Sequence, residues 1–173
     1  LKALAALARV HQSTQKCRNI AKQFRGYLEL LERGESAERE AFSNAVTTNL
    51  TSFFRENHHF DFLAKTIIPE IVARKGNSSK RLRIWSAGCS TGEEPYSIAI
   101  TLKEAQKDLA HWDVKLLCTD LDSDVLKTGK TGVYEQDRVE KIPREQLQRW
   151  FTRSRDKADD RVKMSGKLQD LMT

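Results

Sequence analysis

Residues in the middle of the chain form two strand-like runs separated by a loop and a helix. The strand-like run at 82–85 is followed by small and polar residues at 86–92, and the spacing of apolar residues beyond them predicts a helix from 93 to about 108. A second strand-like run covers 114–119. This order of strand, glycine-containing loop, helix and strand is typical of open α/β folds, in which a small ligand meets the carboxyl ends of the strands.

Helices are predicted before this unit. Residues 1 to about 46 have a helical pattern, with Gly34 as the C-cap of one helix and Ser36 as the N-cap of the next. Residues 58–73 predict another helix that leads toward the sheet. Pro69 interrupts or restarts that helix, because proline lacks the backbone N–H that a continuing helix uses.

A short helix is predicted directly after the second strand. Asp122 or Ser123 caps it, and it covers 124–128. Gly129 and Gly132 are expected to end it, since glycine is common where a helix stops.

The last part of the chain gives weaker signals. Pro143 predicts the start of a further helix that runs through Phe151, because proline is favoured in the first turn. The remaining residues, 152–173, are charged and show little periodicity.

Composition bears on the charge of the expected partner and on the cellular compartment of the protein. The 173 residues carry a formal net charge of +6, which suits an acidic partner without identifying one. Three cysteines in no metal-binding or disulfide pattern indicate a reducing compartment and no metal site. Since the sequence shows neither a signal peptide nor an apolar run long enough to cross a membrane, we expect a cytoplasmic protein without direct membrane insertion.

The glycine loop and the strand end beyond it favour a nucleoside cofactor without phosphates. Asp120 ends the second strand and can accept hydrogen bonds from both hydroxyls of a ribose. The spacing of Gly88 and Gly92 differs from the dinucleotide-binding motif, and Glu93 and Glu94 at the start of the helix would repel a pyrophosphate. S-adenosylmethionine, with its sulfonium, ammonium and ribose groups, matches such a loop.

Two longer motifs carry a resemblance to a known family. They are T-T-N-L-T-S-F-F-R-E at 47–56 and W-S-A-G-C-S-T-G-E-E-P-Y-S at 85–97, and D-L-D at 120–122 and E-Q-L-Q-R-W-F at 145–151 follow in the family's order and spacing. From about Phe24 to the end, the chain resembles the chemotaxis receptor methyltransferases of the CheR type. The resemblance implies a protein-glutamate O-methyltransferase that uses S-adenosylmethionine and releases S-adenosylhomocysteine.

The resemblance also implies an α/β fold class and a domain order. We expect a small N-terminal helical domain at 1–46, a linker and helix at 47–79, and the first part of a class I (Rossmann-like) S-adenosylmethionine-dependent methyltransferase domain at 80–173. Within it, 152–173 would form a small antiparallel subdomain, which in some family members docks a receptor tail. A later family segment with an Arg-Asn pair has no match here, so we expect an incomplete chain; a naturally short paralogue is the alternative.

Site residues follow from the same resemblance. The predicted cofactor-binding residues are Asn49, Thr51, Arg55, Gly88, Glu94 and Asp120. Arg55 is also the predicted catalytic residue, near the methyl group in transfer, and Glu94 would bind the amino-acid end of the cofactor. Purely structural roles remain open, because Asn49 and Thr51 can cap the next helix, Glu94 has capping-box spacing from Thr91, and Asp120 can be a turn residue.

The activity implied is methyl transfer from S-adenosylmethionine to glutamate side chains in the cytoplasmic domain of methyl-accepting chemoreceptors, which forms glutamate methyl esters. The alternative is a non-catalytic module that senses the cofactor or docks a receptor. Nucleic acid is not an expected partner, since the Asn/Asp-Pro-Pro-Tyr pattern of amino-group methyltransferases is absent.

Overall fold

The structure is a computed structural model that describes residues 24–34, 36–75, 80–105, 109, 111–153 and 159–173. The helices predicted before residue 24 lie outside the described residues. The chain divides into two compact units, one comprising Leu1–Asn49 with Leu121–Asp124, the other Leu50–Asp120 with Val125–Thr173. The domain boundaries predicted at 46 and 79 stay predictions.

The first unit contains two described helices, α3 (Phe24–Glu32) and α4 (Ser36–Val46). Gly34 follows α3 with a φ of +82° and donates its N–H to the carbonyl of Leu31, as a C-cap glycine does. Ser36 is the first residue of α4 and not its N-cap as predicted; residue 35 lies outside the described residues. Tyr27 joins the helices by donating a hydrogen bond of 3.1 Å to Glu38.

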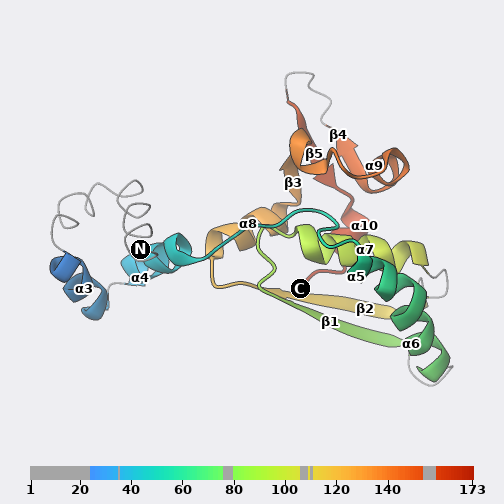
Figure 1. The fold of residues 1–173 in the computed structure, drawn as a ribbon, viewed down its shortest axis with the longest axis horizontal. Helices are drawn as coiled ribbons and strands as arrows, with labels where there is room; N and C mark the ends of the chain where they lie inside the picture. The colour runs from blue at the N-terminus through green and yellow to red at the C-terminus, as the bar shows by residue number, and fades with distance from the viewer. Residues whose placement is uncertain (1–23, 35, 76–79, 106–108, 110, 154–158) are drawn as a thin grey trace. The chain divides into compact units, whose positions relative to one another are not determined.

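The second unit is built on a pair of parallel strands, β1 (Arg81–Ala87) and β2 (Asp113–Thr119). Helix α7 (Glu93–Ala105) connects them and lies along one face of the pair (Figure 1). Buried side chains of both strands pack there against helical residues; the cluster is Ile68, Leu82, Leu102, Leu109, Val114 and Leu116. The predicted unit of strand, loop, helix and strand is confirmed, and with it the α/β fold class.

The segment before β1 is helical, with one irregular turn. Helix α5 (His58–Phe62) continues through a π-helical turn, Leu63–Ile67, into α6 (Ile68–Lys75). Pro69 is the second residue of α6, so it restarts the helix as predicted. The wider turn before it removes the regular hydrogen bond that proline could not donate.

Helix α8 (Ser123–Thr131) is longer than the sequence indicated. Gly129 lies inside the helix, and Gly132, with a φ of +62°, follows its end. Close packing accounts for the interior glycine, because a Cβ built on Gly129 would lie 3.4 Å from the Gly92 Cα and from the backbone of Thr91. Gly129 therefore lets the glycine loop approach α8 and does not terminate the helix.

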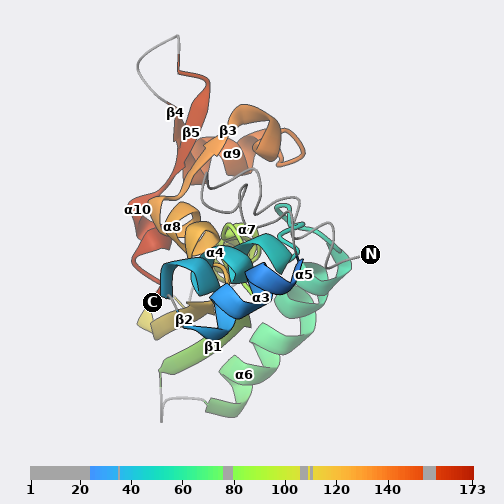
Figure 2. The ribbon, with the colours of Figure 1, turned by 90° about the vertical axis from the view of Figure 1, so that its left-hand side faces the viewer.

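A second, antiparallel sheet follows later in the chain, with strand order β3–β5–β4 (Figure 2). Its strands are β3 (Val133–Glu135), β4 (Phe151–Arg153) and β5 (Arg161–Met164). Besides these, a 3₁₀ turn, Gln136–Val139, a helix α9 (Arg144–Trp150) and a helix α10 (Gly166–Gln169) belong to this region. The last residues return to β2, where Met172 forms a parallel bridge with Leu116.

The helix that Pro143 opens is shorter than predicted. Pro143 occupies the N-cap position of α9, but Phe151 is the first residue of β4 and not the last of the helix. Phe151 is buried, and its ring meets the Phe53 ring edge-on at 5.6 Å between centroids. Burial in this cluster outweighs the local helical pattern.

Candidate functional site

The glycine loop after β1 is tied to the end of β2 through the backbone. Gly88 and Cys89 both donate their N–H to the carbonyl of Thr119, at 2.8 and 2.9 Å. Gly88 and Gly92 have φ values of +80° and +96°, which glycine adopts without strain. A Cβ built on Gly88 would meet no atom within 4 Å, so a ligand can approach the backbone at this point.

Asp120 follows β2 directly and faces the same loop. Its Oδ2 accepts a hydrogen bond of 2.8 Å from the N–H of Ser90. This carboxylate therefore lies at the carboxyl ends of both strands, where open α/β sheets bind their ligands.

Glu94 lies one residue inside α7 with an exposed side chain. Its Oε1 accepts a hydrogen bond of 2.7 Å from the hydroxyl of Ser86, near the end of β1. Thr91 donates its hydroxyl to the other acid, Glu93, at 2.5 Å. The side chain of Glu94 is thus held toward the strand end beside the loop.

From the sequence, Glu93 is predicted only to repel a pyrophosphate together with Glu94, and its structural role is missed. It is wholly buried, and its Oε1 forms an ion pair with Arg138 from the 3₁₀ turn. A buried carboxylate needs such a partner, because removal from water otherwise disfavours its charge. A signal was present in the sequence, since Glu93 has helical spacing with Tyr96 and Ile100, both buried.

The segment 51–56 is anchored by an aromatic side chain. Phe53 is buried and packs edge-on against Tyr134, with ring centroids 5.0 Å apart. The N–H of Phe54 donates to the hydroxyl of Ser97 at 2.9 Å. Phe53 is therefore a packing residue of the second unit.

Arg55 is exposed, between two residues with unusual backbone angles. Phe54 and Glu56 have φ values of +52° and +55°. The Arg55 side chain donates to the carbonyl of Leu50 at 2.7 Å, and the carbonyl of Thr51 accepts a bond of 3.3 Å from Arg138. The structure thus holds Thr51 and Arg55 by contacts within the second unit.

Asn49 belongs to the first unit and has a partner there. Its Nδ2 donates to Asp122 Oδ2 at 2.6 Å, and Asp122 Oδ1 accepts from the N–H of Asp124 at 2.9 Å. Asp122, and not Ser123, therefore caps α8. Among the predicted cofactor residues, Gly88, Glu94 and Asp120 lie together around the carboxyl ends of β1 and β2; a role of Asn49 toward the cofactor stays a prediction.

A cavity of about 460 Å³ borders the glycine loop. Its lining includes Cys89, Ser90 and Gly92 from the loop, with Cys118 from β2 and Met172. Burial raises the pKa of the Cys89 thiol to about 11 and also raises the pKa of Cys118. Both cysteines are therefore protonated near neutral pH and are poor nucleophiles.

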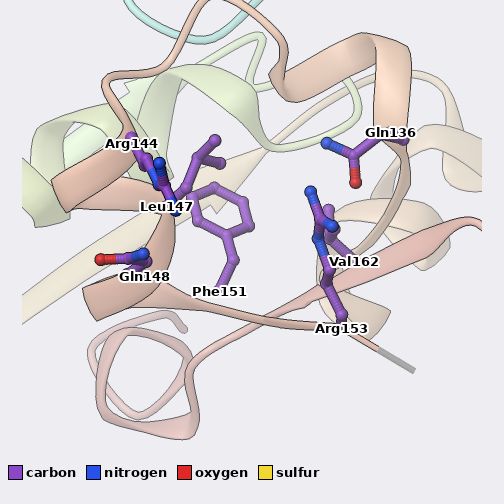
Figure 3. Close-up of a pocket in the computed structure, with 7 residues that line it drawn as sticks. All are labelled: Gln136, Arg144, Leu147, Gln148, Phe151, Arg153 and Val162. Carbon is purple, nitrogen blue, oxygen red and sulfur yellow. The ribbon is translucent and has the colours of Figure 1, made fainter. Parts of the chain in front are cut away.

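A second cavity, of about 510 Å³, lies beside the antiparallel sheet (Figure 3). It is lined by Gln136, Arg144, Leu147, Gln148, Phe151, Arg153 and Val162. Figure 3 shows Leu147 and Phe151 on one side and Gln136 and Arg153 on the other. Arg144 and Gln148 lie on the side of Leu147, and Val162 lies beside Arg153, so both sides combine apolar with polar or cationic groups.

Within the described residues, no three His, Cys, Asp or Glu side chains gather as a metal site would require. The same part of the chain holds no helix with the length and apolar character of a membrane span.

Comparison with known proteins places this geometry in a family. Residues 49–171 match the family model described as "CheR methyltransferase, SAM binding domain". The chain belongs to this family. The resemblance in the two sequence motifs is thereby confirmed, and S-adenosylmethionine is the cofactor that this domain of CheR methyltransferases binds.

Curated relatives agree with the family match. The chain is 41% identical over 148 residues to the "Probable chemotaxis protein methyltransferase" of Rhizobium etli, which covers 81% of this chain and 54% of that protein. It is 47% identical over 132 residues to "Chemotaxis protein methyltransferase 2" of Pseudomonas aeruginosa (75% and 44%) and 44% identical over 132 residues to "Chemotaxis protein methyltransferase" of Escherichia coli (75% and 43%). The chain spans about half the length of these relatives.

Gly88, Glu94 and Asp120, which we call the strand-end residues, fit the cofactor of the CheR family. The open space at Gly88 allows a ligand to approach the backbone, and the carboxylates of Glu94 and Asp120 accept hydrogen bonds from ammonium and hydroxyl groups. Two acids at this edge oppose a phosphate group but not a sulfonium or an ammonium.

Proposed function

We propose that the protein transfers a methyl group from S-adenosylmethionine to glutamate side chains of chemoreceptors and forms methyl esters. The observation that carries the proposal is the grouping of Gly88, Glu94 and Asp120 at the carboxyl ends of β1 and β2, within the matched S-adenosylmethionine-binding domain. The relatives are named chemotaxis protein methyltransferases, which supports the substrate class.

The roles of the strand-end residues follow from their chemistry. Asp120 would accept hydrogen bonds from the ribose hydroxyls, since an ionised carboxylate accepts several. Glu94 would pair with the ammonium of the amino-acid end. Gly88 would let the cofactor lie against the backbone, and Asn49 and Thr51 would add polar contacts.

The proposed task of Arg55 is to align the accepting carboxylate with the methyl group. When bound, the cofactor supplies a methyl group activated by a sulfonium. The accepting glutamate is already ionised at pH 7, so no general base is required. The guanidinium of Arg55 would hold that carboxylate by charged hydrogen bonds and orient it, and exclusion of water would strengthen these contacts.

The proposed partner is the cytoplasmic domain of methyl-accepting chemoreceptors, so the reaction would take place in the cytoplasm. The net charge of +6 supports association with an acidic partner surface.

Calorimetric titration with S-adenosylhomocysteine tests the cofactor site. We expect saturable binding that Asp120→Ala abolishes and that Asp137→Ala, a change of an exposed carboxylate in the 3₁₀ turn, leaves intact. The titration is done on this chain and on the full-length protein. Equal binding by Asp120→Ala would contradict the assigned ribose contact, and binding without methyl transfer by the full-length protein would favour the non-catalytic module.

A further inference from the structure

A buried ion pair joins the start of α7 to the 3₁₀ turn Gln136–Val139. Both carboxylate oxygens of Glu93 have partners, since Oε1 meets Arg138 Nη2 and Oε2 accepts from the Thr91 hydroxyl at 2.5 Å. The Glu93 side chain has no exposed surface, while the Arg138 side chain is partly exposed. Arg138 is therefore the cation that pairs with this buried carboxylate.

Arg138 also holds the segment that carries Arg55. The same nitrogen, Nη2, donates to the carbonyl of Thr51 at 3.3 Å. A second tie comes from Ser97, whose hydroxyl accepts from the Phe54 N–H at 2.9 Å while it donates to the carbonyl of Glu93 at 2.7 Å. Two ties thus connect the segment to the first turns of α7.

The segment needs such ties, because its backbone is not in a locally favoured state. Phe54 and Glu56, on either side of Arg55, both have positive φ values. Residues other than glycine keep this conformation where the surrounding structure imposes it. Contacts from outside the segment therefore fix the direction in which Arg55 leaves the backbone.

We propose that Glu93 and Arg138 form a positioning pair that fixes the segment Thr51–Arg55 against the helix of the glycine loop. The pair sets where the Arg55 guanidinium stands relative to Glu94. This inference rests on the proposed function, in which Arg55 and Glu94 have their roles. In this arrangement Glu94 faces the cofactor, and Glu93 orients the segment Thr51–Arg55.

Hydrogen exchange of the Phe54 amide tests the pair without any need for activity. The variants are Arg138→Met, the double variant Glu93→Gln/Arg138→Met, and the control Arg149→Met. The control breaks another ion pair to α7, the one between Arg149 of α9 and Glu104 of α7. We expect Arg138→Met to lower Tm and to speed exchange at Phe54 about tenfold or more. The double variant removes the unpaired buried carboxylate, so it regains Tm, but the tie to Thr51 is still absent and exchange at Phe54 stays fast. Arg149→Met changes neither readout.

The double variant separates positioning from stability. If it restores slow exchange at Phe54 together with Tm, the pair contributes only to stability and the inference is wrong. Slow exchange at Phe54 in Arg138→Met would overturn it as well.

Binding of S-adenosylhomocysteine to the full-length protein is the second readout. We expect about tenfold weaker affinity in the double variant than in Arg149→Met, because Thr51 and Arg55 are no longer held in place. A wild-type protein that binds no S-adenosylhomocysteine would contradict the proposed function, while the exchange result would still decide whether the pair positions the segment.

Discussion

Glu93 and Glu94 are neighbouring residues of the same type at the start of α7, but their surroundings differ. Glu93 is wholly buried and paired with Arg138, whereas Glu94 is exposed and bonded to Ser86. The helical turn separates adjacent side chains by about 100°, so one points into the unit and the other toward the strand ends. Burial, and not residue type, therefore distinguishes the acid that holds the fold from the acid proposed to bind the cofactor.

Arg55 is the residue on which the proposed transfer depends most. In the full-length protein, Arg55→Ala should lower the rate of methyl transfer by roughly 100-fold or more, because the accepting carboxylate loses its orienting contact. Radiolabel transfer to a receptor fragment measures this rate. Arg149→Ala, another exposed arginine, is the matched control, and a rate close to wild type for Arg55→Ala would show that the assigned role is wrong.

The raised pKa of Cys89 predicts the pH at which its thiol reacts. Burial lifts this pKa from about 9 to about 11, so the thiolate form should be scarce at neutral pH and should increase about tenfold per unit up to pH 10. Alkylation of the Cys89 peptide by iodoacetamide, followed by mass spectrometry, measures this reaction. The unfolded chain in urea is the control and should level off near pH 9; a plateau at that pH in the folded chain would contradict the burial of the thiol.

At the scale of elements, close backbone approach defines the glycine loop. The loop is bonded to the end of β2 through Thr119, and Gly92 lies against Gly129 of α8. The loop therefore takes its shape from two neighbouring elements as well as from its own glycines.

Gly92→Ala should destabilise the chain by about 2–4 kcal/mol. The position has a φ of +96°, and the added Cβ would lie 2.9 Å from the Gly129 Cα, which is backbone and cannot turn away. Urea denaturation measures the free energy of unfolding. Gly166→Ala is the control, since its Cβ would meet nothing within 4 Å, and it should change stability by less than about 0.5 kcal/mol. Similar losses for both variants would rule out close packing as the cause.

At the scale of the whole molecule, the two faces of the parallel strands differ. One face packs under α7, while the other exposes Trp85 and Leu117, at 65% and 46%. Parallel strands in α/β proteins are usually covered on both faces. An apolar surface is thus open in this chain.

Such a surface should bind an apolar fluorescent dye. We expect the dye signal to fall in the variant Trp85→Ser/Leu117→Ser, because the strands then lose most of their exposed apolar area. Phe62→Ser, at an exposed aromatic side chain of α5, serves as the control and should keep the signal. Equal signals from both variants would mean that the dye binds elsewhere.

The sequence by itself determined the α/β unit and the family, and it indicated the residues at the strand ends that we propose for the site. These features depend on local signals, namely strand and helix periodicity, glycines with positive φ, and an acid directly after a strand, as at Gly88 and Asp120. Local signals of this kind can be recognised in the sequence, because the residues involved are close together in the chain.

Only the tertiary structure decided the features that depend on distant contacts. Gly129 is a packing glycine inside α8, where Gly92 lies against it, and Phe151 joins β4, where it is buried near Phe53. Glu93 is a structural acid because Arg138 pairs with it. Local helix propensities differ by about 1 kcal/mol or less between such alternatives, whereas burial of an aromatic ring contributes about 2 kcal/mol, and a buried charge left without its partner costs about 3 kcal/mol or more. The larger, non-local term therefore prevails wherever the two disagree.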